Sequence, residues 1–187
     1  MKIAIYFPGV GYHADKPLLY YSRDIAREAG YEEYRSIAYT CSVKKIRGDM
    51  DKMKRAFEEL YMQTEDALKD IRWDEYDDVL FVSKSIGTVI AITYALKYDI
   101  KNARQVLYTP LAETFTATNA PKDLKAVAFI GTKDPWSDSA KVVELAEALN
   151  IPIHQYEGVN HSLEGDDTLK NLEIMRDVMA KTKDWIG

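Results

Sequence analysis

Three side chains with complementary chemistry each follow an apolar, strand-like run of the chain. They are Ser85, Asp134 and His161, in that order. A serine hydroxyl is a poor nucleophile until a base removes its proton, and an imidazole with an ordinary pKa near ~6.5 suits that task at neutral pH. A carboxylate bonded to the other ring nitrogen fixes the tautomer of the imidazole and stabilises its cation. The sequence therefore predicts nucleophilic catalysis by Ser85, with His161 as the base and Asp134 as the group that orients it.

The residues around Ser85 predict a sharp turn from a strand into a helix. Val79–Val82 is an unbroken β-branched and aromatic run, typical of a parallel strand buried on both faces. From Ile86 to Leu96 the chain is apolar nearly all round the helical circle, which indicates a buried helix. The stretch SKSIG between them leaves little room, so its middle serine is expected at an elbow, with the helix N-terminus behind it. Ser83 is the rival nucleophile.

Backbone amides near this elbow are candidates for an oxyanion hole, the set of donors that stabilises negative charge on an attacked carbonyl oxygen. The amide of Ile86, at the start of the expected helix, is well placed for this role. A second amide is expected from the loop Gly9–Tyr12, from Val10 or Gly11, because glycine lets the backbone approach a ligand closely.

Three aromatic side chains are expected to line a substrate pocket, with ordinary packing as the alternative. Tyr12 and Trp136 belong to the proposed catalytic loops, and Phe115 lies in Thr109–Pro121. That stretch is either a short helix or surface loop, or a rudimentary lid. Lys84, beside the nucleophile, is expected to be a solvated side chain, with donation to a bound ligand as the alternative. With no larger segment to cover it, the site is predicted to be shallow and open, which favours small or exposed acyl groups.

Strand-like and helix-like segments alternate along the chain, which predicts one α/β domain over residues 1–187, with a parallel sheet covered by helices on both faces. The expected strands are Lys2–Phe7, Tyr34–Tyr39, Val79–Val82, Gln105–Tyr108, Ala126–Ile130 and Ile153–Tyr156. The expected helices run from Pro17 to Gly30, from near Asp49 to Ile71, from Ile86 onward, from Asp138 to Asn150 and from Asp167 to Trp185. Met50, Leu169 and Leu172 are expected on buried helix faces. Ligands of such sheets bind beyond the carboxyl ends of the strands, where the three candidate side chains stand.

Composition narrows the class of protein and of partner. In a chain of 187 residues, 47% hydrophobic and 29% charged residues are ordinary for a globular protein. A net charge of −5 without a basic stripe argues against nucleic acid or an anionic membrane surface as the partner. No stretch approaches the ~20 apolar residues of a membrane-spanning helix. With Cys41 as the single cysteine and no clustered histidines, neither a disulfide framework nor a metal or other cofactor is predicted. The cytoplasm is the expected location.

The motifs resemble those of the α/β-hydrolase superfamily. The family's elbow G-x-S-x-G is similar to SKSIG, with Ser83 in place of the first glycine, and its acid, histidine and oxyanion loops are similar to GTKDPW, GVNHSLE and FPGVGY. The resemblance spans nearly the whole chain. It implies a compact, cap-less three-layer α/β/α sandwich, similar to dienelactone hydrolases and esterases, with about six parallel strands in the order 2-1-3-4-5-6. It also implies cleavage or transfer of a small ester, thioester or related acyl group through an acyl-serine intermediate.

Two other functions fit the same architecture. A flavodoxin-like module binds a nucleotide phosphate at the same point of the sheet, but the loop Pro8–Tyr12 lacks the serines and threonines expected around a flavin phosphate. A hydrolase-like fold that has lost catalysis could serve as a partner-binding domain.

Overall fold

The computed structural model describes residues 1–122 and 124–187, and these contain a six-stranded sheet in which all strands are parallel. The strands are β1 (Lys2–Phe7), β2 (Glu33–Ser36), β3 (Asp78–Lys84), β4 (Ala103–Tyr108), β5 (Ala126–Gly131) and β6 (Ile153–Tyr156). Their order across the sheet is β2-β1-β3-β4-β5-β6, which confirms the expected order. The chain passes from β2 on one side of β1 to β3 on the other, so the topological switch point lies between β1 and β3.

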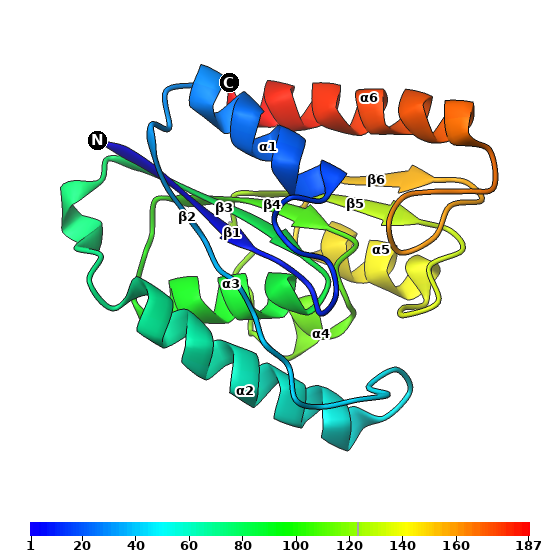
Figure 1. The fold of residues 1–187 in the computed structure, drawn as a ribbon, viewed down its shortest axis with the longest axis horizontal. Helices are drawn as coiled ribbons and strands as arrows, with labels where there is room; N and C mark the ends of the chain where they lie inside the picture. The colour runs from blue at the N-terminus through cyan, green and yellow to red at the C-terminus, as the bar shows by residue number, and fades with distance from the viewer. Residues whose placement is uncertain (123) are drawn as a thin grey trace.

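Helices cover both faces of the sheet and give the three layers seen in Figure 1. One face carries α1 (Pro17–Glu28) and α6 (Thr168–Ile186). The other carries α2 (Met50–Leu68), α3 (Ile86–Lys97), the short α4 (Glu113–Thr116) and α5 (Ser139–Ala148), while a 3-10 turn, η1 (Trp73–Glu75), precedes β3.

The central strands are apolar on both faces because both faces are covered. Alternate residues of β3 enter opposite cores: Phe81 packs against Phe7, with ring centroids 4.9 Å apart, on the α2 and α3 side. Leu80 packs with Tyr108 on the α1 and α6 side. Each fully buried large apolar side chain contributes about 1.5–3 kcal/mol, so these layers hold the strand ends in fixed positions.

Aspartate caps set the starts of three helices. Asp49 accepts a hydrogen bond from the Lys52 amide at 3.0 Å, and Asp138 accepts from the Ala140 amide at 3.0 Å. Asp167 caps α6 in the same way. Such caps satisfy amides that have no partner within the helix, so the helix starts expected near these aspartates are confirmed.

The expectation for the second strand was wrong. It spans Glu33–Ser36 rather than Tyr34–Tyr39, and the last contact with β1 is the Ile37 amide, which donates to the Tyr6 carbonyl at 3.1 Å. This is an edge strand, so no second neighbour holds it. The chain leaves the sheet after Ile37 and crosses below it to α2, as Figure 1 shows.

Four apolar side chains expected on buried helix faces are exposed instead: Met50, Leu96, Leu169 and Leu172. Each lies near an end of its helix, in the first two turns or the last turn. Periodicity identifies the apolar face of a helix but not how far the helix extends past the elements that cover it.

Candidate active site

Ser85 makes the turn from β3 into α3 in a single residue. Its backbone has φ 57° and ψ −127°, and its amide donates to the Tyr108 carbonyl at 3.0 Å. A non-glycine residue with positive φ is strained, by about 1–3 kcal/mol, and such residues cluster at functional sites. The same conformation lifts the side chain off the end of the sheet, as the elbow motif predicts.

Two glycines allow the close approach on which this elbow depends. A Cβ atom on Gly87 would lie 2.3 Å from the Phe7 carbonyl oxygen, and one on Gly9 would lie 3.1 Å from the Ser85 Cβ atom. The first turn of α3 therefore touches the end of β1 directly. This contact brings the Gly9–Tyr12 loop beside Ser85.

Ser83 is placed differently from Ser85. Its side chain is fully buried, and its hydroxyl donates to the Val106 carbonyl at 3.2 Å. It does not line the cavity described below. Ser83 therefore has a structural role. It occupies the first small position of the elbow motif, where its size permits the close packing of strand and helix.

His161 and Asp134 form a hydrogen-bonded pair across the loops after β6 and β5. His161 Nδ1 lies 2.6 Å from Asp134 Oδ2, while Asp134 Oδ1 accepts from the Trp136 amide at 2.8 Å. Both carboxylate oxygens are therefore used, and the carboxylate is held in one orientation. The Trp136 ring lies over the imidazole, with centroids 5.6 Å apart.

Burial lowers the pKa of His161 below its ordinary value of 6.5, and the charge of Lys84 lowers it further, although the hydrogen bond to Asp134 opposes both effects. The imidazole is therefore neutral at pH 7, the form that can accept a proton. Its Nε2 atom is buried and has no hydrogen-bond partner among the described residues, so Ser85 does not donate to it in this conformation. Catalytic hydrogen bonds of unliganded sites often form only when substrate binds.

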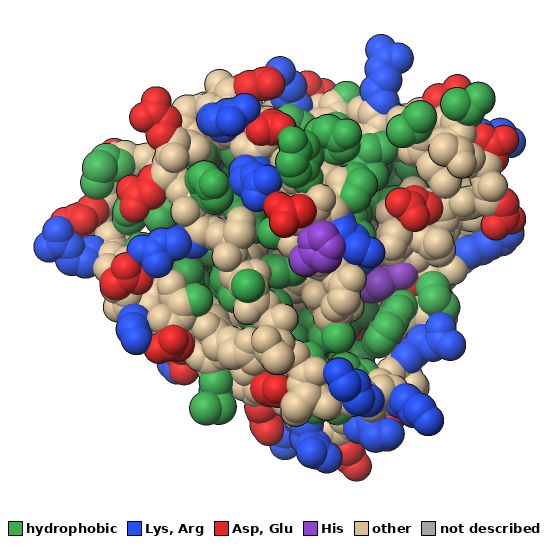
Figure 2. Space-filling view, viewed as in Figure 1, with side chains coloured by type: hydrophobic (Ala, Val, Ile, Leu, Met, Phe, Trp, Pro, Cys, Tyr) green, Lys and Arg blue, Asp and Glu red, His purple; other side chains and the backbone are tan. Residues whose placement is uncertain are grey.

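A cavity of about 190 Å³ brings the predicted groups together above the switch point. Its lining residues are Gly9, Val10, Gly11, Tyr12, Lys16, Ile46, Met53, Lys84, Ser85, Ile86, Trp136, His161 and Ser162. Figure 2 shows histidine side chains on one face of the molecule, among charged, hydrophobic and other side chains. Ser85 and His161 therefore share one small cavity at the carboxyl ends of the strands.

The three amides expected to form an oxyanion hole also border this cavity. Ile86 is the first residue of α3, and Val10 and Gly11 lie in a turn closed by a 3.2 Å hydrogen bond from the Tyr12 amide to the Gly9 carbonyl. No described residue accepts a hydrogen bond from the amides of Ile86, Val10 or Gly11. These donors remain available for a ligand.

Of the three aromatic residues expected to line the pocket, Tyr12 and Trp136 do so and Phe115 does not. Phe115 is 6% exposed and packs with Ile92 and Leu107 in the core beneath α4 and α5, so its assignment to the pocket was wrong. Its apolar side chain is better satisfied in that core than above the sheet, where the segment before α2 already closes the site.

Five residues of the cavity wall were not among the predicted site residues: Lys16, Ile46, Met53, Lys84 and Ser162. Ile46, from the segment before α2, and Met53, from α2, cover one side of it. Ile46 is the one apolar residue of the sequence KKIRG, which is a signal that could have found it. Lys84 is 1% exposed rather than solvated, because β3 directs it beneath Tyr12 instead of outward.

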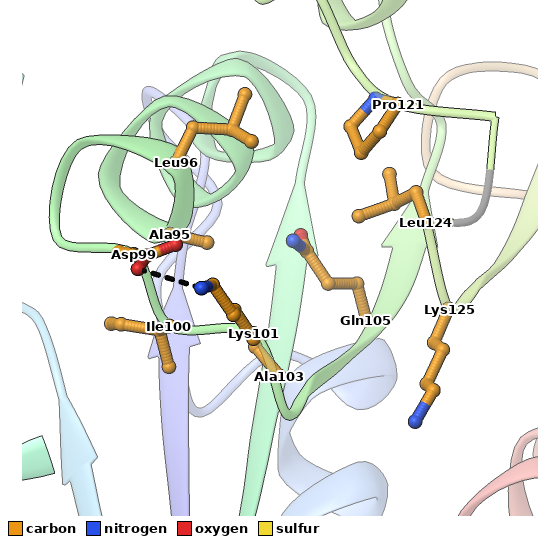
Figure 3. Close-up of a pocket in the computed structure, with 10 residues that line it drawn as sticks. All are labelled: Ala95, Leu96, Asp99, Ile100, Lys101, Ala103, Gln105, Pro121, Leu124 and Lys125. Atoms are coloured by element: carbon orange, nitrogen blue, oxygen red, sulfur yellow. Dashed lines mark ion pairs between the residues drawn. The ribbon is translucent and has the colours of Figure 1, made fainter. Parts of the chain in front are cut away.

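Two other pockets are relevant to this assignment, one beside the site and one at the opposite end of the strands. An apolar groove of about 300 Å³ between α2, α3 and the α4 region shares Met53 and Ile86 with the cavity. A separate cavity of about 350 Å³ lies near the amino-terminal end of β4, where Figure 3 shows the Asp99–Lys101 ion pair and Gln105. Among the described residues, no serine, cysteine or histidine lines that larger cavity, so the chemistry favours the smaller one at Ser85.

No set of three or more His, Cys, Asp or Glu side chains among the described residues is arranged to hold a metal ion. In the same part of the chain, no helix has the length and apolar character needed to cross a membrane.

Comparison with known proteins places this geometry in a structural class. No protein-family model matches the chain, and no curated protein sequence matches it significantly. Among solved structures, a candidate hydrolase of the alpha/beta superfamily from Xanthomonas campestris pv. campestris is 14% identical, with 98% of each chain covered and a TM-score of 0.64. An alpha-beta serine hydrolase homologue from Coxiella burnetii is 17% identical, with 97% of this chain and 84% of that chain covered and a TM-score of 0.60. An esterase from Pyrococcus furiosus is 15% identical, with 100% and 82% covered and a TM-score of 0.57. The chain therefore has the α/β-hydrolase fold.

Proposed function

We propose that this protein is a serine hydrolase that cleaves an ester, thioester or related acyl bond of a small substrate through an acyl-serine intermediate. The observation that carries the proposal is a strained serine elbow that shares one cavity with a carboxylate-bound, neutral imidazole. The fold agrees with this activity, and the side chains around Ser85 carry the proposal, because the same fold hosts unrelated functions.

In the proposed reaction, Ser85 Oγ attacks the substrate carbonyl while His161 Nε2 takes its proton. Asp134 stabilises the imidazolium that forms, and the amides of Ile86 and of Val10 or Gly11 stabilise the oxyanion. The tetrahedral intermediate collapses as His161 gives the proton to the leaving alcohol or thiol. A water molecule, activated by the same imidazole, then attacks the acyl-serine and releases the acid.

Labelling with a fluorophosphonate probe tests this function against the two alternatives. We expect purified, colourless protein to be labelled, and the label to map to Ser85, because the probe reacts with a serine only where a base activates it. Bound flavin absorbance would favour the flavodoxin-like alternative. Colourless protein that is neither labelled nor active on p-nitrophenyl acetate would favour the non-catalytic alternative.

The apolar groove beside the cavity supports an aliphatic acyl chain as the part of the substrate that extends from Ser85. It begins at Ile86, which follows the nucleophile, and runs along α3 past Val89 to Thr93, two helical turns or ~10 Å away. Met50, Met53 and Phe57 of α2 form the facing wall. The groove therefore offers room for a short or medium acyl chain. Its length is limited to the distance from Ile86 to Thr93.

Chain length is therefore expected to affect kcat/KM in two stages. Burial of each methylene contributes about 0.8 kcal/mol, which equals about fourfold, so activity should rise by up to that factor per methylene from acetyl to hexanoyl p-nitrophenyl esters. Hexadecanoyl esters should give no further gain, because the groove is too short to bury them. Steady-state kinetics on the ester series measures both stages.

Thr93→Trp fills the far end of the groove and should lower the ratio of hexanoyl to acetyl activity about tenfold. Thr116→Trp is the matched control, because Thr116 is exposed and does not line the groove. An equal fall in both variants, or a steady preference for the longest chains, would show that the groove does not receive the acyl chain.

A further inference from the structure

Lys84 is a buried lysine directly before the nucleophile, and the reaction described above does not use it. It is the last residue of β3, is 1% exposed and lines the cavity that contains Ser85 and His161. Burying an ammonium group is costly unless a counter-charge or several acceptors compensate it. Lysines are rarely found in such positions, so its presence requires a physical reason.

Two neighbours hold the Lys84 amine in place. Its Nζ atom donates to Thr109 Oγ1 at 2.8 Å and lies 4.9 Å from the centre of the Tyr12 ring. Thr109, just after β4, has φ 43°, a conformation that is unusual for a β-branched residue. A strained threonine and an aromatic ring from two different loops therefore fix one cation beneath the catalytic cavity.

The charges that face Lys84 come from three further elements. Asp134, after β5, attracts it, while Lys16, before α1, repels it, and His161, after β6, shares the cavity. Lys84 makes no ion pair with any described residue, and the Asp134 carboxylate that attracts it is bonded to His161 and to the Trp136 amide. Burial lowers the pKa of Lys84 to about 7.

We propose that Lys84 is a positioning residue of this active site, whose ammonium group, held by Thr109 beneath Tyr12, keeps His161 in the neutral form that accepts the serine proton. Its effect on catalysis rests on the proposed function, but its effect on His161 does not. Lysine, rather than an apolar residue, is present because a positive charge at this place opposes a second positive charge on the imidazole.

The direction of the effect follows from the order in which the two groups titrate. Below neutral pH the Lys84 amine is charged, and this is the range in which His161 would otherwise gain its proton. The ammonium therefore lowers the pKa of His161 and extends the active range of the base to lower pH. Above neutral pH Lys84 loses its charge, but His161 is then already neutral.

An NMR titration of His161 tests this coupling without any substrate. The chain has three histidines, and His13→Gln and His154→Gln variants assign their signals in histidine-labelled protein. Lys84→Met should raise the pKa of His161 by up to about 1, because it removes a like charge that lines the same cavity. The acid limb of kcat/KM should move to higher pH by the same amount.

Lys133→Met is the matched control, because Lys133 is next to Asp134 in the sequence but is exposed to screening solvent. It should leave both readouts unchanged. If folded Lys84→Met protein shows the wild-type His161 titration, the inference is wrong, even where fluorophosphonate labelling supports the hydrolase. If the titration shifts in a protein that neither labels nor turns over esters, the inference holds and the proposed function fails.

A second pair of variants keeps the lysine and so covers the case in which Lys84→Met does not fold. Thr109→Ala removes the hydroxyl that accepts from the ammonium, which disfavours the charged amine and should raise the pKa of His161, though by less than Lys84→Met. Thr109→Ser keeps the hydroxyl and should give the wild-type titration. Equal titrations in the two variants would contradict the assigned role of Lys84.

Discussion

Replacing Ser85 by alanine is expected to lower kcat for p-nitrophenyl acetate by about 10⁵- to 10⁶-fold and to abolish fluorophosphonate labelling. Removal of a nucleophile leaves only the donors of the oxyanion hole and the bound geometry, which retain a residual activity above the uncatalysed rate. The substitution removes one hydroxyl that protrudes into the cavity, so the fold should not change. Kinetic assays at high enzyme concentration measure the loss of kcat, and thermal unfolding measures whether the fold is unchanged.

Ser83→Ala provides the matched comparison, since it removes a hydroxyl two residues away in the same motif. That hydroxyl is fully buried and donates to the Val106 carbonyl, so its loss should cost about 1 kcal/mol of stability and leave kcat within severalfold of wild type. If Ser83→Ala abolishes labelling while Ser85→Ala retains it, the nucleophile has been assigned to the wrong serine.

The positions of Ser85, Asp134 and His161 at one edge of the sheet could be predicted from strong local patterns, whereas the order of the strands was predicted from the resemblance to the α/β-hydrolase superfamily. The apolar run Val79–Val82 has no place except a central strand, and the loops after consecutive parallel strands meet at one edge whatever their detailed conformation. Gly87 is a clear signal for the same reason, since a Cβ atom there would overlap the end of β1. In these places local sequence and tertiary structure agree.

The parts that could not be predicted depend on contacts between distant segments. Lys84 reads as a solvated lysine, because nothing in its own stretch shows that Tyr12 and Thr109 will enclose it. Phe115 reads as a pocket residue, because the core it joins is assembled from α3, β4 and α5. Ile46 and Met53 reach the cavity only because the chain leaves the sheet early after β2. Sequence patterns specify elements, whereas these side chains are placed by how the elements meet.

Asp134→Asn is expected to lower kcat about 10⁴-fold with little change in KM, as loss of the triad carboxylate does in a serine protease. The hydrogen bonds of Asp134 explain why an almost isosteric change should have this effect. The Trp136 amide needs an acceptor, so the amide oxygen of the new side chain would take the Oδ1 position and its NH₂ group would face His161 Nδ1. An imidazole that accepts at Nδ1 carries its proton on Nε2, and it cannot then remove the proton of Ser85.

Asp138→Asn is the matched control, because it makes the same change of side chain, with the same loss of charge, outside the proposed active site. Asp138 lies four residues further on, where it caps α5 through the Ala140 and Lys141 amides, and asparagine caps a helix as well as aspartate does. Its kcat should therefore equal that of the wild type. NMR of labelled histidine should show the Nε2-protonated tautomer of His161 in Asp134→Asn alone. Asp134 is 7% exposed and its carboxylate faces the imidazole and the Trp136 amide, so it should not contact substrate. A rise in KM with an unchanged kcat would mean that Asp134 binds substrate rather than orients the base.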